Sequence, residues 1–176
     1  MNSNSTQRIY PVEADWTPRP VPERNAEECL FDIQHPEILD GFGVDIRDVV
    51  YAWCQYQGLS KIDTDSILEP YLVGFHKVSD GLSVPDWIDR FAGLKGRAKE
   101  HSLEHHPVGV RHDYDWRIGV AFRWSNRRFR RLARATDFTR REARRMWVAV
   151  TYFGWPIYMM HSWRRRRDYT YAHPPW

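Results

Sequence analysis

The sequence predicts a mainly α-helical protein with a small helical N-terminal part, a basic amphipathic helix and one transmembrane helix near the C-terminus. Three observations support this fold class. Apolar residues recur at helical spacing in several segments, and no segment alternates as a half-buried strand does. Arginines crowd the last third of the chain, and they flank an uncharged apolar segment. A length of 176 residues suits one compact unit with appendages.

Residues 1–42 are expected to form an extended arm. Four prolines interrupt its first 28 residues: Pro11, Pro18, Pro20 and Pro22. Such an arm either lies along partner subunits or is a disordered tail, and the sequence does not decide between the two.

Residues 43–110 are expected to form a small soluble helical region. The best-defined helix spans 45–57 and ends at Gly58, a residue that suits a helix C-terminus. Its apolar stripe consists of Ile46, Val49, Val50, Trp53 and Tyr56. Two further helices are predicted near 64–78 and from 83 to 94. Three short helices bury only a modest core, so support from partners is expected.

Charge divides the chain into two unequal parts. Residues 1–110 contain 10 Lys+Arg and 18 Asp+Glu, whereas residues 111–176 contain 16 Arg, no Lys and 5 Asp+Glu. Such asymmetry indicates that the basic part contacts phosphate, either in nucleic acid or in anionic lipid. The exclusive use of arginine favours this interpretation, because guanidinium binds phosphate in a planar, bidentate manner. The alternative is a solvated basic helix face.

Residues 111–138 are predicted to form a basic amphipathic helix at a membrane surface. Between Trp116 and Ala135 there is no proline, and apolar positions recur at helical spacing among arginines. This combination is typical of helices that lie on an anionic bilayer. The same helix could instead dock on RNA, with Trp124 and Phe129 stacking on bases.

Residues 139–167 are predicted to form a capped transmembrane helix, followed by a short tail over 168–176. Thr139 and Glu142 have the spacing of a capping box. The uncharged segment between the flanking arginines would extend about 27 Å as a helix, close to the thickness of a bilayer core of about 30 Å. Trp147 and Trp163 lie near its two ends, where interfacial aromatic residues anchor a span.

Five residues weaken the prediction of a span. Thr151, Gly154, His161 and Ser162 dilute the hydrophobicity, and Pro156 would kink the helix. The alternative is a helix buried in a soluble core, which would need polar residues on at least one side.

The sequence offers no catalytic constellation, so a non-enzyme without a cofactor is expected. His101, Glu104 and His105 match the H-x-x-E-H pattern of inverted zinc peptidases, but so short a match in a polar run next to a proline indicates a solvated helix end. Cys29 and Cys54 lie 25 positions apart without a CxxC motif, so we expect buried thiols rather than a redox pair. No metal site is predicted.

The layout resembles the single-pass accessory subunits of mitochondrial inner-membrane complexes. The resemblance covers residues 113–176, which combine the basic stretch Trp116–Ala135, the aromatic-rich segment Trp147–Trp163 and the arginine-rich tail. It implies a non-catalytic accessory subunit that braces respiratory complex I, or else ATP synthase or complexes III or IV. It also implies that the partners are other subunits of the complex and an anionic phospholipid such as cardiolipin, with a single pass through the inner membrane.

The arginines on both sides of the apolar segment are the predicted lipid- or phosphate-binding residues. They are Arg127, Arg128, Arg131, Arg134, Arg140, Arg141, Arg144, Arg145, Arg164 and Arg165. Their excess on the N-terminal side predicts that the N-terminal part lies in the matrix. The alternative function is that of a basic RNA-binding protein of a mitochondrial or other ribosome, in which the same arginines contact phosphates.

Overall fold

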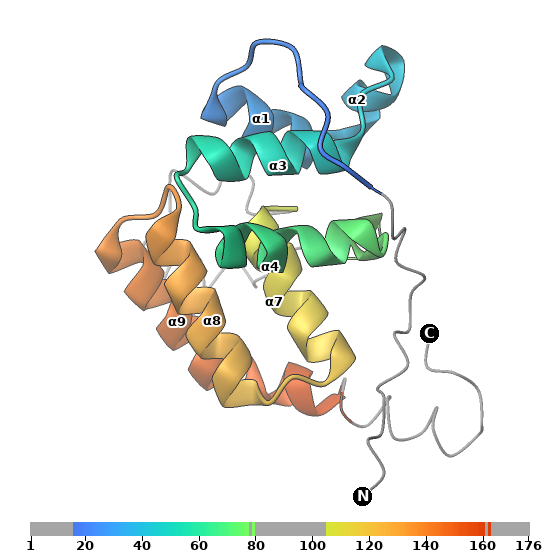
Figure 1. Ribbon diagram of the computed structural model, residues 1–176. Helices are drawn as coiled ribbons and strands as arrows, with labels where there is room; N and C mark the ends of the chain where they lie inside the picture. The colour runs from blue at the N-terminus through green and yellow to red at the C-terminus, as the bar shows by residue number, and fades with distance from the viewer. Residues whose placement is uncertain (1–15, 78, 80–104, 161, 163–176) are drawn as a thin grey trace, which may run out of the picture.

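The computed structural model describes residues 16–77, 79, 105–160 and 162, which form helices and no strand (Figure 1). The elements in chain order are α1 (Ala26–Gln34), α2 (Pro36–Phe42), α3 (Ile46–Tyr56), α4 (Lys61–Leu72), the 3-10 helix η1 (Phe75–Lys77), α7 (Pro107–Ile118), α8 (Phe122–Ala135) and α9 (Arg140–Phe153). The prediction of a mainly α fold is confirmed. The helix predicted over 83–94 lies outside the described residues.

Successive helices pack on one another around a single core. α1 packs on α3, α3 on α4, α4 on α7, α7 on α8, and α8 on α9. In Figure 1, α1 and α3 cover the upper end, and α8 runs beside α9 at the lower left. The largest fully buried side chains come from α1, α2, α3, α4, α7 and α8, and they include Ile33, Leu39, Trp53, Ile67, Val108 and Phe129. The predicted soluble region and the predicted basic helix therefore share one core.

Helix α3 agrees with the sequence prediction. The side chain of Asp45 accepts a hydrogen bond from the backbone N–H of Arg47 at 2.9 Å and caps the helix N-terminus. Val49, Val50 and Trp53 of the predicted stripe are buried in the core. Apolar periodicity and capping therefore specify the same helix.

Residues 26–42, predicted to belong to an extended arm, instead form α1 and α2. A capping box starts α1: the Asn25 side chain accepts from the Glu28 N–H at 2.9 Å, and the Glu28 carboxylate accepts from the Asn25 N–H at 2.8 Å. Cys29 and Ile33, one turn apart, are buried beneath this helix. The prolines named for the arm, the last of which is Pro22, all precede this capping box, so they do not interrupt α1.

The helix predicted from Trp116 to Ala135 is divided into α7 and α8. Gly119 ends α7 with φ +87°, a left-handed conformation that favours glycine. The chain then turns, so that α8 packs back on α7. α7 itself begins earlier than predicted, at Pro107.

The apolar side of α8, predicted to rest on a bilayer, instead faces the bundle core. Phe129, Leu132 and Ala133 are buried there. The polar residues Ser125 and Asn126 on the same side are also buried, and both hydrogen-bond inside the bundle. Only the arginine-rich side of α8 is therefore left to meet a partner.

Helix α9 begins where the sequence predicts but ends early. Thr139 and Glu142 form the predicted capping box, with the Glu142 N–H donating to Thr139 Oγ1 at 3.2 Å. α9 ends at Phe153, and residues 155–160 form a separate helical stretch, so the continuous helix predicted over 139–167 is not formed. In the described part of the chain, no helix has both the length and the apolar character that crossing a membrane requires.

Gly154, the C-cap residue of α9, lies between the Val150 carbonyl oxygen and the indole of Trp116. A Cβ atom built on Gly154 would come within 2.5 Å of Cη2 of Trp116. We therefore expect Gly154→Ala to lower the free energy of unfolding by about 1–3 kcal/mol, since either the indole or α9 must move. Chemical denaturation compares this variant with Gly41→Ala, a control at a glycine whose added Cβ meets nothing within 4 Å. Equal stability of the two variants would contradict the close approach.

Candidate functional site

The arginines of α8 point to two different sides of the bundle. Arg128 and Arg131 reach toward α7 and α4, where Arg128 pairs with Asp115 and Arg131 with Asp63, each at 2.7 Å. Arg127, Arg130 and Arg134 follow one another at three- and four-residue spacing and so share another side of the helix.

This second side forms one wall of an open groove between α8 and α9. The groove has a volume of about 550 Å³. Its lining consists of Arg127, Arg130, Arg131, Arg134, Ala135, Arg140 and Trp147. None of the described residues that line it is acidic. We refer to it as the arginine groove; it gathers five arginines on one concave surface, and one of them, Arg131, is paired with Asp63.

Two tryptophans hold arginines of the groove. The guanidinium carbon of Arg130 lies 4.9 Å from the ring centroid of Trp147, and that of Arg127 lies 5.4 Å from the ring centroid of Trp124. Stacking on an aromatic face leaves the guanidinium N–H edges free to bind phosphate. The predicted membrane anchor Trp147 is half-buried in the groove wall, whereas Trp124 is 64% exposed.

The other predicted arginines are distributed as follows. Arg141, Arg144 and Arg145 are exposed on α9, outside the groove lining. Arg164 and Arg165, together with Trp163 and the tail, lie outside the described residues. The sequence prediction omitted Arg130, although its spacing from Arg127 and Arg134 places all three on one side of a helix.

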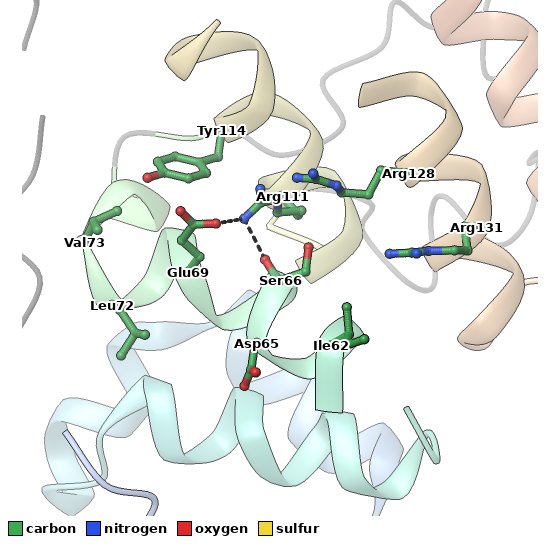
Figure 2. A pocket seen from close by; sticks show the side chains of 10 residues that line it. All are labelled: Ile62, Asp65, Ser66, Glu69, Leu72, Val73, Arg111, Tyr114, Arg128 and Arg131. Carbon is green, nitrogen blue, oxygen red and sulfur yellow. Dashed lines mark hydrogen bonds and ion pairs between the residues drawn. The ribbon is translucent and has the colours of Figure 1, made fainter. Parts of the chain in front are cut away.

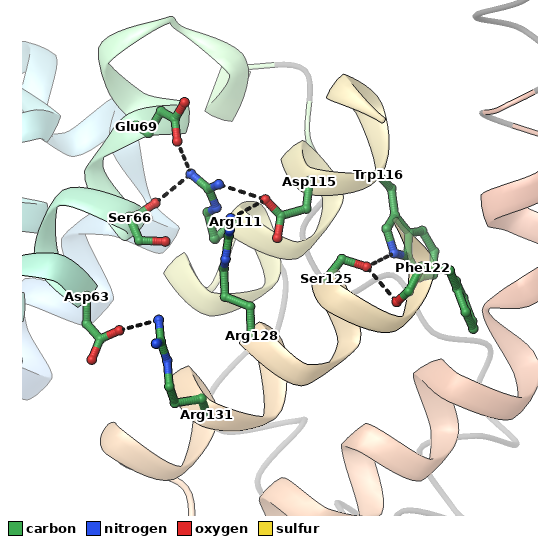
Figure 3. A network of polar contacts seen from close by, with 10 residues as sticks. All are labelled: Asp63, Ser66, Glu69, Arg111, Asp115, Trp116, Phe122, Ser125, Arg128 and Arg131. Carbon is green, nitrogen blue, oxygen red and sulfur yellow. Dashed lines mark hydrogen bonds and ion pairs between the residues drawn. The ribbon is translucent and has the colours of Figure 1, made fainter. Parts of the chain in front are cut away.

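On the opposite side of α8 lies a buried ionic network centred on Arg111 (Figure 3). Arg111 donates to the Ser66 carbonyl oxygen at 2.9 Å, to the Glu69 carboxylate, and to Asp115 Oδ1 at 2.7 Å. Arg128 donates to the same oxygen of Asp115 at 2.7 Å. Burial raises the pKa of the fully buried Asp115 carboxyl, and the two guanidiniums oppose this shift. Arg128 is thus engaged in holding α7 to α8 and is not part of the arginine groove.

This network borders a second pocket, of about 460 Å³, between α4, α7 and α8 (Figure 2). Its lining comprises Ile62, Asp65, Ser66, Glu69, Leu72, Val73, Arg111, Tyr114, Arg128 and Arg131. We refer to it as the α4 pocket. Arg131 lines both this pocket and the arginine groove, so the two cavities adjoin at that residue.

The described residues offer no assembled metal site or activated nucleophile. No group of three His, Cys, Asp or Glu side chains there could hold a metal ion. Cys29 and Cys54 are free and buried, in agreement with the sequence prediction, and burial raises the pKa of Cys29 to about 11 and that of Cys54 to about 12. These thiols therefore stay protonated near neutral pH. His101 and Glu104 of the H-x-x-E-H pattern lie outside the described residues.

A buried histidine between α7 and α8, His112, is expected to make the stability of the fold sensitive to acid. Nε2 of His112 donates to Oδ1 of Asn126 at 2.8 Å, and burial lowers the pKa of His112 to about 4. Between this pKa and the ordinary value of about 6.5, the unfolded chain binds the proton and the folded chain does not. The stability that the neutral form of His112 gives the folded chain is therefore complete above about pH 6.5, and it is lost as the pH falls toward 4.

We expect this histidine alone to remove roughly 3 kcal/mol of stability over that range, at about 1.4 kcal/mol per pKa unit. Chemical denaturation between pH 4 and pH 7 measures it by comparison with His112→Gln, which keeps a donor for Asn126 but does not titrate. Parallel pH profiles for the two proteins would contradict a neutral buried His112.

No family model, no curated protein and no solved structure matches this chain.

Proposed function

We propose that this protein is a non-catalytic nucleic-acid-binding protein whose arginine groove holds the phosphate backbone of a single strand, with RNA as the first form to test. The observation that carries the proposal is a concave surface lined by five arginines and a tryptophan, with no acid among the described lining residues. Arginine in that number and arrangement suits a run of phosphates better than a single small anion.

The shape of the groove supports a strand as the ligand. The arginine stripe of α8 can be extended from Arg134 back to Arg123, and it then spans about 16 Å at 1.5 Å per residue. That length allows contacts with several successive phosphates. Trp124, largely exposed beside Arg127, offers a face on which a base can stack. Since the apolar side of α8 is buried, the helix meets its partner through charge.

The triple variant Arg127→Ala, Arg130→Ala, Arg134→Ala tests this proposal. Each phosphate contact with a single strand contributes a factor of about 5 at 0.1 M salt, so the variant is expected to bind RNA on the order of 100-fold more weakly. Fluorescence anisotropy with a labelled single-stranded RNA measures the affinity.

The matched control removes the same charge elsewhere. Arg19→Ala, Lys61→Ala, Lys77→Ala changes three cations that lie outside the groove lining. It is expected to weaken binding only slightly. An equal loss of affinity in both triple variants would show that net charge, rather than the groove, controls binding, and it would overturn the proposal.

A second candidate function is the accessory subunit of an inner-membrane energy-transducing complex, binding anionic lipid. It is favoured by large apolar side chains exposed at the end of α9 and just after it: Tyr152, Phe153, Trp155, Ile157, Met159 and Met160. Patches of this kind mark protein or membrane contacts. Arg144 and Arg145 precede them on α9 and would suit anionic headgroups.

Alkaline carbonate extraction of membranes from cells that express the full chain tests the second candidate. Retention in the pellet, followed by migration with a large complex on a native gel, would support an integral accessory subunit. Release into the supernatant would contradict it and leave the nucleic-acid proposal in place.

A further inference from the structure

We infer that the α4 pocket receives one unstacked base of the strand that the arginine groove binds. The inference rests on the proposed function. It adds a site that contacts a base to a surface that otherwise contacts only phosphates. Three features of the pocket carry it: its lining, its unsatisfied polar atoms and its position.

The lining combines flat apolar surface with polar groups. Leu72, Val73 and the buried ring of Tyr114 form apolar wall, and Ser66 and Arg111 lie side by side in the polar part (Figure 2). A volume of about 460 Å³ falls within the range of small-molecule sites. A planar heterocycle with hydrogen-bonding edges matches this combination of walls.

Two buried polar atoms of the pocket residues lack a hydrogen-bond partner among the described residues. These atoms are Oγ of Ser66 and Nε of Arg111. A buried polar group left unpaired is costly, so such atoms commonly mark where a ligand or water completes the structure. Nε–H of Arg111 is a donor, and the Ser66 hydroxyl both donates and accepts. Both atoms are buried at the pocket wall, so a small shift of the two side chains would bring them to the carbonyl and ring-nitrogen edge of a base.

The position of the pocket connects it to the phosphate surface. Arg131 belongs to both linings, and its side chain is 56% exposed while paired with Asp63. A strand that follows the arginine groove therefore passes the pocket at Arg131. Rotation of one nucleotide out of the stack would bring its base toward Ser66, while its phosphate remains among the arginines of α8.

The experiment compares a labelled decauridine RNA with an abasic decamer of the same ribose-phosphate backbone. Ser66→Ala removes the unsatisfied hydroxyl, and Ser66→Leu also fills the pocket. We expect Ser66→Ala to weaken decauridine binding about fivefold, the effect of one hydrogen bond. Ser66→Leu should weaken it further. Neither variant should change binding of the abasic decamer, which depends on the arginine groove alone.

The outcomes separate the two proposals. If both RNAs bind the wild-type chain and neither Ser66 variant changes the ratio of their affinities, the base pocket is overturned and the phosphate groove stands. If neither RNA binds, both proposals fail. Because Ser66 Oγ makes no hydrogen bond to a described residue, Ser66→Ala should leave the unfolding temperature unchanged or slightly raised. If Ser66→Leu binds the abasic decamer as tightly as the wild-type chain does, the variant has kept its fold.

Discussion

Replacing Asp115 with alanine is expected to lower the free energy of unfolding by about 3–5 kcal/mol. The carboxylate is fully buried and accepts hydrogen bonds from Arg111 and Arg128, each at 2.7 Å. Without it, Glu69 is the one charged partner that the largely buried Arg111 keeps among the described residues, and the ion pair that joins α7 to α8 is lost. Removing one member of a buried ion network leaves uncompensated charge in the core, which is why the loss is large.

Urea denaturation measures this loss against Asp65→Ala, which removes an exposed acid from the rim of the α4 pocket. The control is expected to change stability by less than about 0.5 kcal/mol. A loss below about 1 kcal/mol for Asp115→Ala would contradict the central place of this carboxylate in the network.

Phe129→Ala is expected to destabilise the fold by about 3–5 kcal/mol. The ring is 1% exposed, lies on the apolar side of α8, and packs against His112 at a centroid distance of 4.8 Å. Truncating it removes a large buried surface and leaves a cavity in the middle of the bundle.

Trp124→Ala is the matched control, because Trp124 is a large aromatic residue on the same helix with most of its surface in solvent. It should change stability little but weaken RNA binding. Comparing the stabilities of the two variants distinguishes a helix packed in the core from a helix that lies on a membrane surface. If α8 rested its apolar side on a bilayer, Phe129→Ala would leave the stability of the protein in solution nearly unchanged.

Apolar periodicity and capping predict the helices well but not what covers them. Helix α3 and the start of α9 follow from Asp45, Thr139 and the stripes behind them. The stripe of α8 is equally clear, yet the same pattern arises on a helix in a bundle and on a helix at a bilayer. Its cover comes from α7 and α9, and the turn that brings α8 back onto α7 follows the left-handed Gly119.

The early end of α9 has a local and a tertiary basis: Pro156 lacks the N–H that would continue the helix, and the indole of Trp116 lies against Gly154. By hydropathy, the uncharged segment continues past Gly154. In the structure, α9 ends at Phe153, and the indole of Trp116 lies against Gly154. Trp116 is itself held by a hydrogen bond from its indole N–H to Ser125 Oγ at 2.7 Å. The interruption at Pro156 can be predicted from the sequence, whereas the contact between Trp116 and Gly154, nearly 40 positions apart, cannot.

The candidate site could be predicted in part. The concentration of arginine indicates a phosphate surface, but charge counting cannot tell Arg128, which is paired with a buried acid, from Arg127 in the arginine groove. The four-residue spacing of Arg111 and Asp115 is typical of an ion pair within one helix, and the structure contains that pair. The α4 pocket joins three helices and is visible only once they are packed together.

The salt dependence of RNA binding by the wild-type chain tests the central claim most directly. If all five arginines of the groove contact phosphates of a single strand, log K should fall against log salt concentration with a slope of about −3.5. The triple variant lacking Arg127, Arg130 and Arg134 should reduce that slope to about −1.4. A wild-type slope near zero, or a slope that the triple variant leaves unchanged, would contradict the arginine groove as the binding surface.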